Sequence, residues 1–125
     1  MNARALTLIP ALALMAALAP AASAAPDPGE TQYNQRCKAC HVIAPGDVSG
    51  PIAPNLRGVV GRKAGTGTFK MYSPALKASG LTWTPANLEK YLTSPVKLVP
   101  GTRMVIGVSD PAQRKALLAY LSKQK

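Results

Sequence analysis

The chain has 125 residues, which is room for one domain and argues against a large multi-domain enzyme. Lysine and arginine together number 15 against 5 acidic residues, so the formal net charge is +10. One Phe, one Trp and four Tyr can build only a thin core, and small domains of this kind usually need a disulfide, a metal or another staple. Two Cys and one His limit the metal chemistry that the chain can support.

The first 24 residues have the pattern of an export signal. Arg4 gives a positive start, residues 6–18 are mostly apolar, and Ala22-Ser23-Ala24 offers the small residues of a cleavage site. This pattern is typical of a secretory signal peptide, with cleavage after Ala24. A retained membrane anchor is the alternative, but a bilayer takes about 20 apolar residues to span, whereas this run is shorter and is broken by Pro10.

We therefore expect residues 1–24 to be removed and residues 25–125 to form one soluble, exported domain with no transmembrane anchor. Without Arg4, 14 of the 15 basic residues remain beside the 5 acidic ones, a formal charge of +9. That charge alone would allow a nucleic-acid partner, but export argues against one. The expected location is the periplasm.

The exported part is predicted to be helical, with glycine- and proline-rich loops between the helices. A capping residue followed by proline can open a helix at four places: Asp27-Pro28, Ser73-Pro74, Thr84-Pro85 and Asp110-Pro111. Gly80 is expected to end the second helix and Ser94-Pro95 the third. No alternation of apolar and polar residues predicts a strand, so the expected class is all-α.

Residues Cys37-Lys38-Ala39-Cys40-His41 form a C-x-x-C-H motif, the attachment site of c-type haem. Two thiols at this spacing can reach the two vinyl groups of one porphyrin, and the adjacent imidazole then lies under the iron. We therefore expect one covalent haem c on Cys37 and Cys40, with His41 as an iron ligand. This large apolar cofactor would supply the core that the composition lacks.

Three other interpretations of the two cysteines explain less. A disulfide would close only a very short loop and add little stability. A thioredoxin-like redox pair should stand beside a β-α-β pattern, which the sequence does not show. A structural zinc site takes four ligands, and the chain has three Cys and His residues in all.

The second axial ligand of the iron is expected to be a methionine. The sequence has no second His, so ligation by two imidazoles is excluded. Met71 and Met104 are the methionines that follow the signal peptide. Met104 ends the turn Pro100-Gly101-Thr102-Arg103-Met104, which can present a thioether at a fixed place, so we expect it to bind the iron. Met71 has no such turn and is expected in the core or at the surface.

The ordered set of segments resembles the class I cytochromes c, of the mitochondrial and bacterial cytochrome c2 type, over about residues 29–121. Besides the motif and the Met104 turn, the matching segments are Pro54-Asn55-Leu56-Arg57-Gly58, Gly61-Arg62-Lys63-Ala64-Gly65, Gly80-Leu81-Thr82-Trp83-Thr84, and the C-terminal Leu117-Leu118-Ala119-Tyr120-Leu121. The resemblance implies a small cytochrome c fold, in which several short helices wrap around one covalently bound haem.

The resemblance also implies further cofactor-binding residues. Arg62, Tyr72 and Trp83 would hold haem propionates, and Thr102 would bond near the second propionate. Without the resemblance, Arg62 reads as one more solvated charge and Trp83 as packing. A buried propionate does need a donor or a cation, which these side chains can supply.

Two more contacts of the iron ligands follow from the resemblance. The carbonyl of Pro54 would accept the N–H of His41, and Tyr91 would lie near the sulfur of Met104. The alternative for Tyr91 is that its side chain only packs in the core. We expect packing alone for Tyr33 and Tyr120.

The sequence also departs from the family. Leu76 stands where the mitochondrial proteins have an Asn near a buried water, and Ile106 stands where the family has a Phe beside the haem. Residues 49–53 are more apolar and proline-rich than usual, and Val96-Lys97 replaces a lysine pair. These departures bear on partner preference rather than on haem binding.

The implied function is one-electron transfer, not enzyme catalysis, because His41 and Met104 leave no iron position for a substrate. We expect a monomer whose partner is an oxidase, a reaction centre or a dehydrogenase with an acidic docking surface. Basic residues near the haem could form the docking ring: Arg36, Lys38, Lys97 and Arg103. A generally basic surface is the alternative for these four.

Two other functions stay open. One is a dedicated cytochrome subunit of a periplasmic dehydrogenase, which has the same chemistry but one permanent partner. The other is a haem enzyme or a gas sensor, which needs a weak or absent second ligand.

Overall fold

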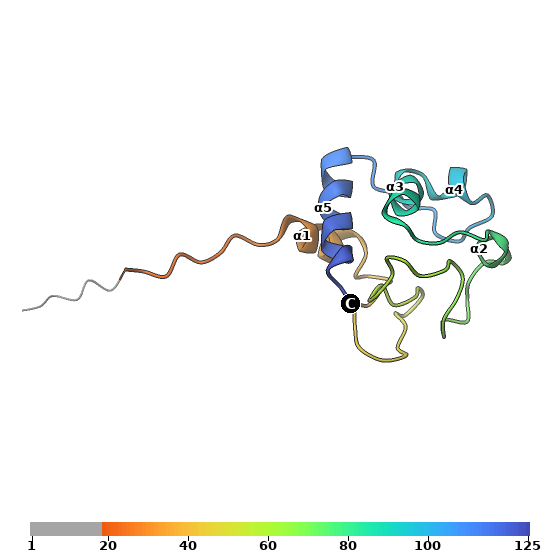
Figure 1. Ribbon diagram of the computed structural model, residues 1–125, viewed down its shortest axis with the longest axis horizontal. Coiled ribbons are helices and arrows are strands. Elements are labelled where there is room, and N and C mark those ends of the chain that lie inside the picture. The colour runs from red at the N-terminus through yellow and green to blue at the C-terminus, as the bar shows by residue number, and fades with distance from the viewer. Residues whose placement is uncertain (1–18) are drawn as a thin grey trace, which may run out of the picture.

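The computed structural model describes residues 19–125, so most of the predicted signal peptide lies outside the described residues. Residues 19–26 are exposed and run away from the folded body as an extended segment (Figure 1). The body contains five helices: α1 (Pro28–Arg36), α2 (Pro74–Ala78), α3 (Pro85–Thr93), α4 (Pro95–Leu98) and α5 (Pro111–Ser122). Within this part of the chain an isolated bridge joins Lys63 to Thr82 and no strand forms, so the expected all-α class is confirmed.

Each of the four predicted openings begins a helix. The side chains of Asp27, Ser73, Thr84 and Asp110 accept hydrogen bonds from backbone N–H groups of the first turns of α1, α2, α3 and α5. These bonds satisfy donors that have no partner inside a helix.

The short helix α4 was not predicted. Ser94-Pro95 does end α3, as expected, but the same dipeptide also opens α4. A proline is well suited to a first helical position, because its missing N–H would have no partner there. At Ser94-Pro95 the sequence predicted only the end of α3, whereas in the structure α3 ends and α4 begins there.

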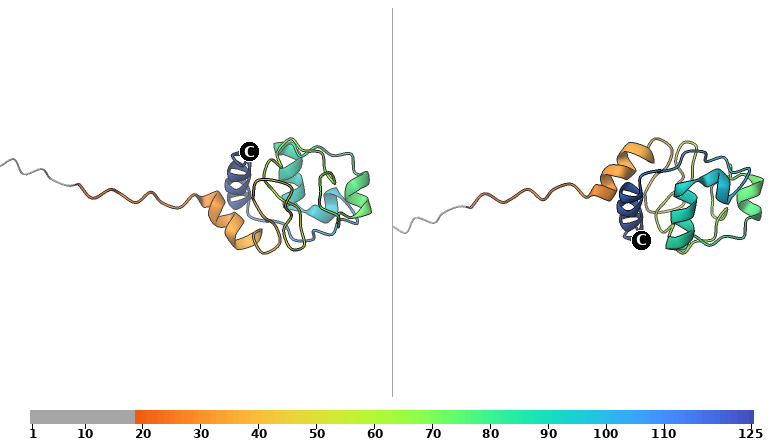
Figure 2. Two further views of the ribbon diagram at one scale, coloured as in Figure 1. Left: turned by 90° about the horizontal axis from the view of Figure 1, so that it is seen from below. Right: turned by 90° about the horizontal axis from the view of Figure 1, so that it is seen from above.

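Helices α1 and α5 cross at the N-terminal side of the body (Figures 1 and 2). The crossing is close because α1 carries Gly29, where any side chain would collide with the carbonyl of Ala116 and with Cβ of Tyr120. Leu117 is completely buried beside it. At the edge of the crossing Lys123 Nζ lies 3.1 Å from Asp27 Oδ2.

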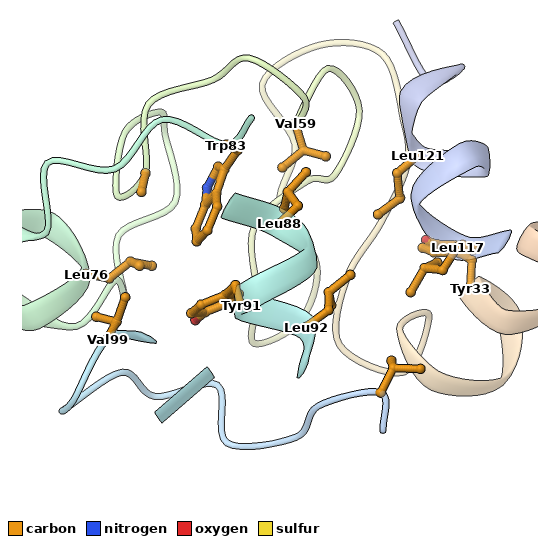
Figure 3. Packing of buried hydrophobic residues seen from close by; sticks show 12 residues of the cluster. Tyr33, Val59, Leu76, Trp83, Leu88, Tyr91, Leu92, Val99, Leu117 and Leu121 are labelled. Atoms are coloured by element: carbon orange, nitrogen blue, oxygen red, sulfur yellow. The ribbon is translucent and has the colours of Figure 1, made fainter. Parts of the chain in front are cut away.

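Helix α3 runs through the middle of the core (Figure 3). Its buried side chains point both ways: toward Leu76, Trp83 and Val99 on one side, and toward Tyr33, Leu117 and Leu121 on the other. The α3 residues are Leu88, Tyr91 and Leu92. This arrangement makes α3 the support from which the loops on its two sides are positioned.

Among residues 19–125 no helix has both the length and the apolar character that crossing a membrane requires.

Candidate functional site

The C-x-x-C-H residues form a tight turn directly after α1. Cys37 is the C-cap of α1, and its backbone N–H bonds to the carbonyl of Tyr33 at 2.9 Å. The N–H groups of Cys40 and His41 both bond to the carbonyl of Cys37, at 3.0 and 2.8 Å. Both thiols are free and half-buried, and burial raises the pKa of the Cys37 thiol to about 11. The turn thus gathers two thiols and one imidazole within residues 37–41.

His41 is oriented through its Nδ1, which lies 2.8 Å from the carbonyl oxygen of Pro54. A carbonyl can only accept, so Nδ1 carries the proton and Nε2 keeps its lone pair. Burial lowers the pKa of His41 and favours the neutral ring. A neutral imidazole with one nitrogen held by the backbone and the other free is the usual state of a metal ligand.

The Pro54 carbonyl is itself held in place by Asn55. The Asn55 side chain donates to the carbonyl of Ala44 at 2.7 Å and accepts from the Ala44 N–H at 3.3 Å. The N–H of Leu56 bonds to the carbonyl of Val42 at 2.8 Å. Residues 42–44 and 54–56 are therefore joined side by side, and the acceptor for His41 cannot move independently of the chain that carries His41.

Gly50 lies on the other side of the motif. Its N–H bonds to the carbonyl of Ala53 at 2.8 Å, which closes the loop of residues 50–53. A Cβ at position 50 would collide with the carbonyl of Cys40 and come within 3.0 Å of Cα of His41. The segment that departs from the family pattern is thus packed directly on the backbone of the motif.

The turn that ends in Met104 is fixed at three points. Gly101 has φ of +88°, a conformation that favours glycine. The buried hydroxyl of Thr102 lies 2.6 Å from the hydroxyl of Tyr91 on α3, and the guanidinium of Arg103 donates to the carbonyl of Met71 at 2.7 Å. Met104 itself is half-buried against the core.

Met71 differs from Met104 in its surroundings. It is 47% exposed, and its contact with the Met104 turn is made by its backbone carbonyl. The structure therefore places Met71 at the surface and Met104 at the edge of the core.

Arg62 and Tyr72 line one cavity of about 360 Å³, whose wall also includes Pro54 and Asn55. Arg62 donates to the carbonyls of Asn55, at 2.7 Å, and Arg57, at 3.3 Å. The hydroxyl of Tyr72 donates to the carbonyl of Thr66 at 2.8 Å. These backbone bonds hold both polar groups at the cavity.

Trp83 and Thr102 meet elsewhere, at Tyr91. The ring centroids of Trp83 and Tyr91 are 4.7 Å apart, and burial raises the pKa of Tyr91, so its hydroxyl stays protonated beside Thr102. Within the described residues, no hydrogen bond engages the indole N–H of Trp83. Every fully buried side-chain nitrogen there has a hydrogen-bond partner, so this N–H is at least partly exposed. The structure thus forms two groups, Arg62 with Tyr72 and Trp83 with Thr102.

The sequence model of the family described as cytochrome c matches residues 26–125. The chain belongs to the cytochrome c family. A cytochrome c2 of Rhodoblastus acidophilus is 46% identical over 101 residues, which are 80% of this chain and 92% of that protein. A cytochrome c-550 of Nitrobacter winogradskyi is 41% identical over 96 residues, which are 76% of this chain and 86% of that protein.

A solved relative supports the fold. The structure of cytochrome cH from Methylobacterium extorquens is 45% identical, with a TM-score of 0.67, and the match covers 76% of this chain and 94% of that one. The small cytochrome c fold expected from the sequence is therefore confirmed. As a member of this family the chain is a monohaem c-type electron carrier and not an enzyme.

The cofactor of the cytochrome c family is covalent haem c with its iron, and the residues of this chain fit it. Two free thiols can form the covalent bonds to the porphyrin, and a neutral imidazole and a thioether can bind the iron. Several apolar side chains pack on the core but remain partly exposed and so can contact a flat apolar group: Ile43, Leu56, Val60, Tyr72, Leu98 and Met104.

Three contributors to the site were missed or understated by the sequence reasoning. Tyr33 was expected only to pack, but its hydroxyl also donates to the carbonyl of His41 at 3.2 Å. Asn55 was noted only as part of a matching segment, and Gly50 only as part of an unusual one. No local pattern could have revealed these contacts, since each joins residues that are separated along the chain by 8 or more positions.

Proposed function

We propose that the chain carries one haem bound covalently to Cys37 and Cys40, with His41 and Met104 as the axial iron ligands, and that it shuttles single electrons between redox proteins of the periplasm. When bound, the haem supplies a reversible one-electron couple at its iron. The observation that carries the proposal is the Nδ1 hydrogen bond of His41, which leaves Nε2 free to bind a metal, in the turn that also carries the two free thiols.

Met104 as the second ligand is supported by its partial burial and by the bonds that fix its turn. Thr102 and Arg103, the two residues before it, are tied to α3 and to Met71. A thioether held in this way needs little reorganisation between redox states, which suits rapid electron transfer. Two protein ligands leave no iron position for a substrate, in keeping with a carrier.

The haem propionates have four proposed partners. Arg62 and Tyr72 share a cavity, so we assign them to one propionate. A carboxylate is a stronger acceptor than the backbone carbonyls that these groups now engage. Trp83 has an accessible N–H, and Thr102 has a hydroxyl beside Tyr91. These two would bind propionate oxygens on the side of α3.

Removal of residues 1–24, which leaves residues 25–125 as the working domain, is part of the proposal. The expected cleavage point after Ala24 lies in the exposed, extended segment of residues 19–26. A peptidase can reach such a segment without disturbing α1. N-terminal sequencing of the purified holoprotein tests this step, and a chain that still begins at Met1 would contradict it.

The proposed partners are proteins with acidic docking surfaces, such as an oxidase, a reaction centre or a dehydrogenase, and the carrier is proposed to be a monomer. The basic side chains that would form the docking ring are all exposed: Arg36, Lys38, Lys97 and Arg103. A second candidate is a dedicated cytochrome subunit of a dehydrogenase. It is favoured by Val105, which follows Met104 and is 67% exposed, because a permanent partner would cover this apolar side chain.

The decisive test of covalent attachment is acid-organic extraction of the purified protein. Haem should remain on the polypeptide of the native sequence, and Cys37→Ala or Cys40→Ala should leave it joined through one thioether only. A wild-type chain that loses all of its haem would overturn the assignment.

The axial ligand is tested by substituting each methionine. Met104→Ala should open the iron to added ligands, and Met71→Ala, the matched control, should leave the absorption spectrum unchanged. Exchange of these two outcomes would overturn the choice of ligand. Binding of carbon monoxide by the native ferrous protein would favour a gas sensor or a haem enzyme instead of a carrier.

A further inference from the structure

We infer that Arg114 is a positioning residue for Met104, acting on the chain that leads away from this methionine. The inference rests on the proposed function, since it takes Met104 as the iron ligand. It concerns a part of the molecule that no sequence motif marked, the return of the chain from Met104 to α5.

Arg114 is a buried charged residue on α5, only 8% exposed. Its Nη1 donates to the carbonyls of Val108 and Ser109, at 2.8 and 2.9 Å. Its Nε donates to Oε1 of Glu89 on α3 at 2.7 Å. One guanidinium therefore joins α3, α5 and the segment between Met104 and α5. We call this set of four residues the Arg114 clamp: Glu89, Val108, Ser109 and Arg114.

The clamped segment is also pressed onto the end of α3. The N–H of Val108 bonds to the carbonyl of Leu92 at 2.7 Å. A Cβ on Gly107 would come within 2.7 Å of the Leu92 carbonyl oxygen and 3.1 Å of that of Thr93. The backbone of residues 107–109, three to five positions after Met104, is therefore held closely against the end of α3.

Met104 consequently lies between two anchors. Before it, Thr102 bonds to Tyr91 and Arg103 bonds to Met71. After it comes the Arg114 clamp. Between Met104 and the clamp, the backbones of Val105 and Ile106 make no hydrogen bond to another part of the described chain that could hold the segment. The second anchor therefore depends on residues 107–109.

Loss of the second anchor should weaken the hold on Met104. A segment released from the clamp gains conformational freedom, and that gain favours the state in which the thioether has left the iron. Lysine cannot replace Arg114 here, because a single ammonium lacks the flat fork of donors that serves a carboxylate and two carbonyls together. Arg114→Lys keeps the charge and should still break the clamp.

The test is a titration of the ferric holoprotein with imidazole, followed through the far-red absorption band that marks methionine bound to haem iron. Arg114→Lys should raise the affinity for imidazole about tenfold, the size expected when hydrogen bonds to a charged group are lost. Glu89→Gln, on a less buried side chain, should act in the same direction but less, since Arg114 keeps its carbonyl bonds. If the Arg114→Lys protein does not fold, the imidazole affinity of the Glu89→Gln protein tests the inference in its place.

A matched control separates positioning from general stability. The control is Leu121→Val. Leu121 lies on the same helix as Arg114 and is buried, but it makes no hydrogen bond to residue 108 or 109. The substitution should lower the midpoint of chemical unfolding and leave the imidazole affinity unchanged. An equal rise in affinity for Leu121→Val would overturn the inference, because the effect would then follow stability alone.

Failure of the inference and failure of the proposed function give different results. A wild-type protein without the methionine band would overturn the ligation of iron by Met104, and the inference with it. A wild-type protein that shows the band, together with Arg114→Lys and Glu89→Gln proteins that bind imidazole as the wild type does, would overturn the inference alone.

Discussion

The ring of His41 is bonded to a carbonyl that lies 13 positions further along the chain, with 2.8 Å between Nδ1 and the oxygen of Pro54. This bond selects the tautomer and the orientation of the imidazole. The carbonyl cannot be removed by a side-chain substitution, but the residue that steadies it can. Asn55 is that residue, since its side chain makes two hydrogen bonds to Ala44.

Asn55→Ala is expected to lower the stability of the holoprotein by about 1–3 kcal/mol, because it removes two half-buried hydrogen bonds and leaves their backbone partners unpaired. Guanidinium unfolding followed through haem absorbance measures the effect. The matched control is Asn87→Ala, which removes an exposed bond to the carbonyl of Thr82. Equal losses in the two variants would mean that Asn55 has no special place at the site.

The helix beginnings could be predicted because their physics is local. At each of these four helix N-termini, the capping side chain accepts hydrogen bonds from N–H groups no more than three residues further along the chain. The C-x-x-C-H motif is equally local, as its three reactive groups share one turn. The close crossing at Gly29 could not be predicted from a local pattern, because nothing in the sequence pairs Gly29 with Ala116.

The remainder of the site could not be predicted because it is made of non-local contacts. Arg114 reads in the sequence as one basic residue among many, yet it is buried and bonded to Glu89, Val108 and Ser109. The helix α4 was missed for a different reason: the dipeptide Ser94-Pro95 is as good a start as it is a stop.

Gly50→Ala is expected to reduce the yield of haem-bearing protein. The added methyl group would collide with the carbonyl of Cys40, so either residues 50–53 or the C-x-x-C-H turn must shift. A shifted turn would present the thiols and His41 less well for haem attachment. The measurement is the ratio of haem to polypeptide in purified protein, with the neighbouring exposed Ser49→Ala as control. A normal ratio for Gly50→Ala would show that residues 50–53 can move away freely.

Asp27 is expected to make the fold sensitive to acid. Its carboxylate accepts from Lys123 and from the N–H of Gly29, and these bonds lower its pKa from 3.8. Because the folded pKa lies below the unfolded one, its contribution to stability is fully present above about pH 4 and is lost as the pH falls through the folded value. Asp27→Asn keeps a capping side chain but removes the charge.

The measurement for Asp27 is the midpoint of guanidinium unfolding at pH 7 and at pH 3. Acid titrates other groups as well, so the drop between the two pH values is compared among variants. Asp27→Asn should show a smaller drop than the wild type, whereas Asp47→Asn, at an exposed position outside α1, should drop as the wild type does. Identical drops in all three proteins would show that the Lys123 pair does not persist in solution.

Electron transfer to the physiological partner is expected to slow as salt rises. The chain without residues 1–24 has a formal charge of +9, and attraction to an acidic partner is screened beyond about 10 Å at 0.1 M salt. Lys97→Glu should slow the second-order rate further and flatten its salt dependence, because it reverses the charge of an exposed residue of the proposed docking ring. Lys125→Glu, in the C-terminal tail that follows α5, reverses the same charge and should matter less. A rate that is indifferent to salt would instead indicate docking through apolar side chains such as Ile52 and Ile106, which are 64% and 69% exposed. It would also fit a permanent subunit, whose electron transfer does not wait for a diffusional encounter.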